Sequence, residues 1–126
     1  MEIYDQFQIF TDTRLIGGTN VQTQFQAYRL ITGRVEVSYN DEWGTVCDDS
    51  FDMNDARVAC RMMGMDGAVS FCSGNSRDHC RSGSGKTWLD DLACNGNENS
   101  LFDCRRNTGQ EDCGHNEDVG VICNGE

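Results

Sequence analysis

The sequence has few basic residues: its 126 residues include 10 Lys and Arg against 21 Asp and Glu, a formal net charge of −11. Binding phosphates needs a basic face, so this balance argues against nucleic acid as a specific partner. No apolar run is long enough to span a membrane. The N-terminus also lacks the basic start and apolar run of a signal peptide. We therefore expect a mature or excised piece whose targeting signal lies elsewhere.

Proline, internal repeats and Asn-x-Ser/Thr sites are absent, and no two cysteines have the Cys-x-x-Cys spacing of zinc ribbons and fingers. His79 and His115 lie near Cys80 and Cys113, which leaves a structural zinc as the alternative. The even number of cysteines, eight, instead favours disulfides, and disulfides place the protein in an oxidising, extracellular compartment. Because only 37% of the residues are hydrophobic, we expect the bridges to compensate for a modest core.

Residues 33–49 predict a β-hairpin around which the chain is organised. Val35, Val37 and Tyr39 alternate with polar residues, which is the period of a half-buried strand. Residues 40–42 have turn chemistry, and 43–46 return as a second short strand. The hairpin leads directly to a cysteine and two adjacent carboxylates.

A helix is predicted over residues 54–63, with Asp52 as its N-cap and Gly64 just beyond its C-terminus. Its apolar residues recur on one face, so Cys60 should point into the core. The remaining segments predict strands at 21–27, 87–94 and 119–123, a strand or ordered arm at 1–13, a helical turn at 97–104, and a small, polar loop at 67–86. We expect a local bridge between Cys72 and Cys80 inside that loop.

Five segments together resemble the scavenger receptor cysteine-rich (SRCR) domain family: 33–37, 43–49, 55–61, 88–91 and 115–123. The resemblance implies an α+β fold in which a curved antiparallel sheet cradles one main helix. It implies an SRCR domain at 29–124, preceded by an N-terminal extension at 1–28.

Spacing alone cannot fix the disulfide pairing. The resemblance implies Cys47–Cys113, Cys60–Cys123 and Cys94–Cys104. The chain departs from the family's eight-cysteine group, whose further pair would fall at Ile31 and Met65 here. The remaining pair, Cys72–Cys80, is expected to be a local bridge specific to this chain.

SRCR domains are non-catalytic modules, and several bind Ca²⁺ or Mg²⁺ through an acidic cluster. Carried over by position, the first such site maps onto Asp48, Asp49 and Glu117. A bond between Cys47 and Cys113 would bring Glu117 close to Asp48, and a hard cation would relieve the repulsion between the carboxylates. A second, weaker site maps onto three further residues: Asp90, Glu98 and Asp112. The alternative is a solvated acidic surface without a specific metal.

The resemblance also implies scavenger or pattern-recognition binding, in innate immunity, of anionic ligands such as microbial surface polysaccharides or other polyanions. Bidentate guanidinium groups could assist a bound cation. The candidate ligand-binding residues are Arg77, Arg81, Lys86, Arg105 and Arg106. The alternative is that these groups neutralise the protein's own acids.

Two other function classes are compatible with parts of the sequence. Residues 14–18 are similar to the activation site of trypsin-like proteases, but the sequence has no Gly-Asp-Ser-Gly-Gly and no Ser/His/Asp set, so we predict no enzyme. A metal-independent protein–protein adhesion module, in a mosaic receptor or a secreted protein, is the second alternative.

The N-terminal extension carries one strand more than the resemblance requires. Either residues 14–16 or residues 29–31 could form the opening strand of the domain. We expect the surplus strand to add to a sheet edge, in the same chain or in a neighbour, and so to allow an oligomer.

Overall fold

The computed structural model describes residues 10–17, 20–22, 29–107 and 113–125. Strands, one α-helix and short 3-10 turns alternate along the chain. In order they are β1 (Phe10–Ile16), β2 (Asn20–Gln22), β3 (Arg29–Tyr39), β4 (Glu42–Val46), α1 (Met53–Met62), β5 (Gly67–Cys72), η2 (Asp78–Cys80), β6 (Lys86–Ala93), η3 (Leu101–Asp103), β7 (Arg105–Asn107), η4 (His115–Glu117) and β8 (Gly120–Gly125).

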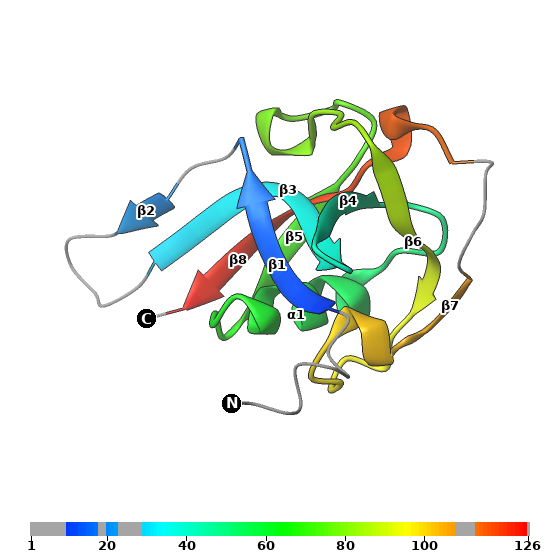
Figure 1. Ribbon diagram of the computed structural model, residues 1–126. Coiled ribbons are helices and arrows are strands. Elements are labelled where there is room, and N and C mark those ends of the chain that lie inside the picture. The colour runs from blue at the N-terminus through cyan, green and yellow to red at the C-terminus, as the bar shows by residue number, and fades with distance from the viewer. Residues whose placement is uncertain (1–9, 18–19, 23–28, 108–112, 126) are drawn as a thin grey trace.

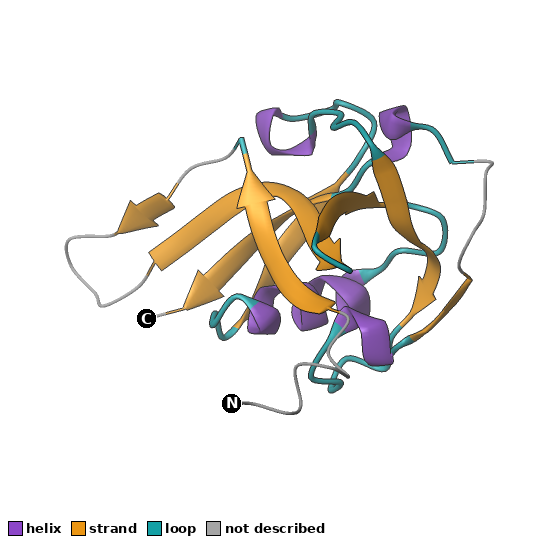
Figure 2. Ribbon diagram, in the orientation of Figure 1, coloured by secondary structure: helices purple, strands orange, loops and turns teal. Residues whose placement is uncertain are grey.

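The strands form one curved sheet in the order β5-β8-β3-β4-β6-β7, and β1 and β2 also pair with β3 (Figure 1). All pairings are antiparallel except that of β4 with β6. Strand β8, last in the chain, lies inside the sheet between β5 and β3. The α-helix packs on β5 and β8, and the 3-10 turns lie in the connections between strands (Figure 2). The α+β fold expected from the sequence is confirmed.

The predicted hairpin joins β3 to β4. Asn40 and Asp41 have φ angles of 54° and 65°, as the two-residue type I′ loop requires, and this loop matches the twist of the flanking strands. The inward side chains Val35 and Val37 are fully buried. The hairpin therefore contributes buried side chains to the core, and its second strand leads directly to Cys47.

The helix begins and ends one residue before its predicted limits of 54 and 63. Asp52 is the N-cap: its side chain accepts hydrogen bonds from the backbone N–H groups of Asn54 and Asp55, and the Asp55 carboxylate accepts one from Asp52 N at 2.7 Å. This reciprocal pair is a capping box. Gly64, with φ +82°, follows the C-terminus in the left-handed region.

All four expected disulfides are present: Cys47–Cys113, Cys60–Cys123, Cys72–Cys80 and Cys94–Cys104. The Cys60–Cys123 disulfide joins α1 to β8. Buried aliphatic side chains from the strands and the helix surround it, and they include Val35, Val37, Val46, Val58, Leu89, Leu92, Leu101, Val119 and Val121.

The prediction of a loop throughout 67–86 is wrong at its N-terminal end. Residues Gly67–Cys72 form the edge strand β5, paired with β8. The register shifts between Ala68 and Ser70, which leaves Val69 half-exposed and interrupts the alternation expected of a strand. The partner strand β8 also lies about 50 residues further along the chain, so the sequence of residues 67–72 alone does not indicate that they pair with it.

Both candidates for the opening strand are strands. Residues 14–16 lie in β1, which pairs with β3 from Phe10 to Ile16, and residues 29–31 form the start of β3 itself. The surplus strand thus adds to the sheet of its own chain. Of the predicted strand at 21–27, residues 23–27 lie outside the described residues. An oligomer through the N-terminal strand stays a prediction.

Candidate functional site

The end of β4 is fixed to the segment around η4 by backbone hydrogen bonds on both sides of Cys47. Asp48 N donates to Glu117 O at 3.0 Å, and Val119 N donates to Val46 O at 3.0 Å. The disulfide from Cys47 to Cys113 closes the same junction. Three independent links therefore place Glu117 beside the two aspartates that follow β4.

The three carboxylates of the predicted first site meet at this junction. Asp48, Asp49 and Glu117 each offer an oxygen within 4.8 Å of those of the others and of the Cys47 sulfur. All three side chains are partly exposed. Asp48 Oδ2 also accepts a hydrogen bond from Ser73 Oγ at 2.7 Å. The chemistry of this donor set, oxygen ligands open to solvent, fits a hard divalent cation.

The residues of the predicted second site fall in different surroundings. Asp90 is buried, with 4% of its surface exposed. It forms an acidic group with Asp49 and Asp91, in which one carboxylate oxygen of each residue lies within 4.8 Å of the other two. Glu98 lies against the Cys94–Cys104 disulfide. Hydrogen bonds from the backbone N–H groups of its own loop, that of Asn95 foremost, lower the pKa of Glu98.

Asp112, the third member, lies outside the described residues, so this second site stays a prediction. Sequence reasoning missed Asp91, whose proximity to Asp90 in the sequence was the available signal. Asp91 has φ 52°, a left-handed conformation that breaks the alternation of β6. That break allows neighbouring carboxylates to meet at one place.

The basic candidates are distributed over three elements. Arg81 forms an exposed ion pair with Asp78 at 3.6 Å, and Lys86 Nζ lies 5.6 Å from the centroid of the Trp88 ring. Arg106 donates to Phe102 O at 2.6 Å, and the neighbouring Arg105 is exposed. The fifth candidate, Arg77, lines a cavity beside β5.

A buried aspartate supports the segment that carries Glu117. Asp118 is fully buried, and its Oδ2 accepts from Gly83 N and from His115 Nδ1, both at 2.8 Å. His115 Nε2 is 3.0 Å from Gly85 O. Burial lowers the pKa of His115, but the hydrogen bonds to Asp118 and Gly85 outweigh it and leave the pKa raised. A carboxylate and a carbonyl both need a donor, so this geometry favours the doubly protonated imidazolium.

A second charged network, also missed from the sequence, holds β1 on β3. Glu36, only 6% exposed, accepts from Arg14 Nη2 at 2.8 Å and from Arg34 Nε at 3.0 Å. The Arg14 guanidinium also lies 3.9 Å from the centroid of the Trp43 ring. This network engages Arg14 and Arg34 with the protein itself.

Comparison with known proteins assigns the family. The model of the scavenger receptor cysteine-rich domain matches residues 26–124. The chain belongs to the SRCR family. The sequence resemblance is therefore confirmed, and that the Cys72–Cys80 pair is specific to this chain stays a prediction.

Relatives of this SRCR domain occur within much longer proteins. Macrophage receptor MARCO of Mesocricetus auratus is 45% identical over 115 residues, which are 90% of this chain and 20% of that protein. Lysyl oxidase homolog 2A of Danio rerio is 53% identical over 93 residues, which are 73% of this chain and 12% of that protein. The chain thus spans a fifth or less of these two relatives.

Two solved SRCR structures agree with the fold. The dimeric form of the SRCR domain of mouse MARCO has a TM-score of 0.68 at 46% identity, covering 82% of this chain and 93% of that chain. The third SRCR domain of murine neurotrypsin has a TM-score of 0.72 at 36% identity, covering 90% and 95%. Within the described part of this chain, α1 and the 3-10 turns are all too short or too polar to cross a membrane.

Proposed function

We propose that this SRCR domain is a non-catalytic, extracellular binding module that holds Ca²⁺ or Mg²⁺ between Asp48, Asp49 and Glu117. Through the cation it binds anionic ligands such as microbial surface polysaccharides or other polyanions, as a scavenger or pattern-recognition module does. The observation that best supports this proposal is that three partly exposed carboxylates from two segments of the chain lie close together.

Preorganisation supports the cation site. The disulfide and the backbone hydrogen bonds already hold the carboxylates together, so binding needs little ordering of the chain. Glu117 Oε1 lies 3.4 Å from the Cys47 sulfur and 3.6 Å from that of Cys113, against the bridge that fixes it. A cation coordinated by carboxylates on one side keeps open positions for oxyanions of a ligand on the other.

The four disulfides support the extracellular location, since such bridges persist in oxidising compartments. The name of the macrophage receptor relatives supports a receptor context for the module. A divalent ion would also offset part of the net charge of −11, which otherwise opposes a polyanion.

The test is calorimetric titration of Ca²⁺ into chelator-stripped protein and into the Asp48→Ala/Asp49→Ala variant. We expect binding heat with a Kd of about 10⁻⁴–10⁻³ M in the parent and none in the variant. The matched control is Asp66→Ala/Asp103→Ala, which removes two exposed carboxylates elsewhere and should bind Ca²⁺ like the parent.

Ligand binding is then measured with a sulfated polysaccharide, with and without chelator. Loss of binding in chelator and in Asp48→Ala/Asp49→Ala supports the proposal. Absence of heat at millimolar Ca²⁺ refutes the cation site and favours the metal-independent adhesion module.

A further inference from the structure

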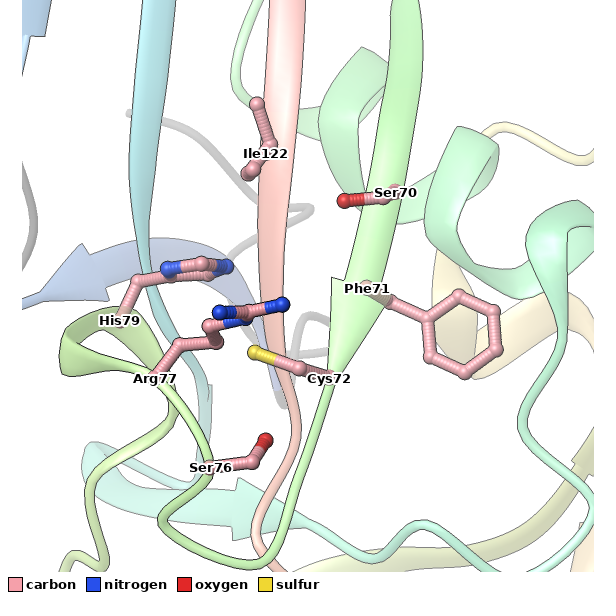
Figure 3. A pocket seen from close by; sticks show the side chains of 7 residues that line it. All are labelled: Ser70, Phe71, Cys72, Ser76, Arg77, His79 and Ile122. Atoms are coloured by element: carbon pink, nitrogen blue, oxygen red, sulfur yellow. The ribbon is translucent and has the colours of Figure 1, made fainter.

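A cavity of about 800 Å³ lies beside the Cys72–Cys80 disulfide. Side chains from β5, β8 and the segment around η2 line it: Ser70, Phe71, Cys72, Ser76, Arg77, His79 and Ile122 (Figure 3). Its volume lies within the range of sites that enclose small molecules, about 300–1,000 Å³.

The cavity opens on the face of the sheet opposite the helix. Phe71 packs edge-on against Phe51 with the ring centroids 5.2 Å apart, and Cys123 is bonded to Cys60 of α1. Strand alternation therefore turns Ser70 and Ile122 to the other face. Figure 3 shows Arg77 and His79 extending from the η2 segment towards β8 and β5, while the Phe71 ring points away.

The wall that carries Arg77 and His79 is fixed in place. Besides the Cys72–Cys80 bridge, Ser76 Oγ donates to Ser73 O at 2.7 Å, and Arg34 Nη1 donates to Arg81 O at 2.8 Å. The backbone of η2 lies so close to β8 that a Cβ added at Gly120 would overlap the backbone oxygen of His79. A cavity that exists before its ligand arrives avoids the ordering cost of binding.

Arg77 supplies an available cation. Within the described part of the chain, its guanidinium is in no ion pair or hydrogen bond, whereas the adjacent Asp78 is almost fully exposed and pairs with Arg81. An arginine without a protein partner can bind a carboxylate or sulfate through two parallel hydrogen bonds.

The other lining groups are neutral. Burial and the charge of Arg77 lower the pKa of His79, so at neutral pH its ring offers one donor and one acceptor. The hydroxyls of Ser70 and Ser76 can each donate and accept. Ile122 provides an apolar wall.

We propose that this cavity binds one acidic sugar unit, with its carboxylate or sulfate on Arg77, and that it does so without a metal ion. A sugar hydroxyl both donates and accepts, as do the neutral polar groups around the arginine, and the C–H face of the ring suits Ile122. A single cation matches a singly charged group better than a polyphosphate, which the net charge of −11 would repel.

This inference goes beyond the proposed function because it needs neither the cation nor its carboxylates. The two sites are nevertheless neighbours, since Ser73, which donates to Asp48, follows the cavity residue Cys72 directly. A polysaccharide with several acidic groups could reach both.

The test is an NMR titration of the 126-residue chain in excess chelator, following the Ile122 methyl signals and the His79 ring signals. The probes are glucuronate, glucose 6-sulfate, glucose and a capped acidic dipeptide. We expect the acidic sugars to shift both sets of signals, glucose to bind about tenfold more weakly, and the dipeptide to bind less tightly than the acidic sugars. The two acidic sugars distinguish carboxylate from sulfate recognition.

Arg77→Ala should weaken binding about tenfold, with Arg77→Lys between it and the parent. Arg57→Ala removes an equal charge from an exposed site on α1 and should bind like the parent. Equal binding of glucose and glucuronate, an unaffected Arg77→Ala variant, or a preference for the dipeptide would each overturn the proposal. Chelator is present throughout, so a failure of the cation site leaves this result unchanged.

Discussion

Replacing Cys47 and Cys113 together by serine should destabilise the domain more than replacing Cys72 and Cys80 together. The two bridges are well matched otherwise, because each joins a buried cysteine to a partly exposed one. They differ in the loop that they close, with sequence separations of 66 and 8. Loop-closure entropy gives about 4.4 kcal/mol for the longer loop and about 2.6 kcal/mol for the shorter.

The assay is urea denaturation followed by tryptophan fluorescence. A difference of about 1.8 kcal/mol between the two double variants should separate their midpoints by about 1 M urea. The Cys47→Ser/Cys113→Ser variant should also lose Ca²⁺ affinity because Glu117 lies against that bridge, whereas Cys72→Ser/Cys80→Ser should retain it. Equal free energies of unfolding for the two variants would refute the loop-closure reasoning.

Three further predictions concern stability. Burial raises the pKa of Asp55 from 3.8 to about 6, so the folded chain retains a proton that the unfolded chain loses between these values. The free energy of unfolding, measured against Asp55→Asn, should therefore fall by about 2 kcal/mol as the pH rises from about 4 to 6; a flat difference would contradict this. Asp52→Ala removes the N-cap and should cost about 1 kcal/mol in thermal unfolding, and a change within error would contradict the capping role. Gly120→Ala should cost about 3 kcal/mol and shift the His79 ring signals, whereas Gly67→Ala, which meets only ordinary contact, should be near neutral.

Local patterns in the sequence were enough for the hairpin, the helix and its caps, because periodicity and capping chemistry act over a few residues. The family resemblance added the long-range disulfides, and with them the meeting of Asp48 and Glu117. Edge strand β5 could not be recognised because its partner is distant in sequence and a bulge at Val69 interrupts its alternation.

The proximity of the Asp49 carboxylate to those of Asp90 and Asp91 could not be read from the sequence either. It depends on the left-handed backbone at Asp91 and on a parallel strand pair, neither of which has a clear sequence signal. The cavity at Arg77 requires the η2 segment to lie on β8, and only the three-dimensional contact at Gly120 reveals that arrangement.

The position of β8 has a consequence for how the chain folds during synthesis. Among the described strands of this domain β8 is translated last, yet it is an inner strand, paired on both sides, and it carries Cys123. The pairing of β3 and β5 with β8 and the Cys60–Cys123 bridge therefore cannot form until β8 has been translated. Until then β3 and β5 each expose an unpaired edge, and Cys60 stays available for incorrect pairing. We expect oxidative folding of this domain to be completed only after β8 has been translated, and to depend on disulfide isomerisation.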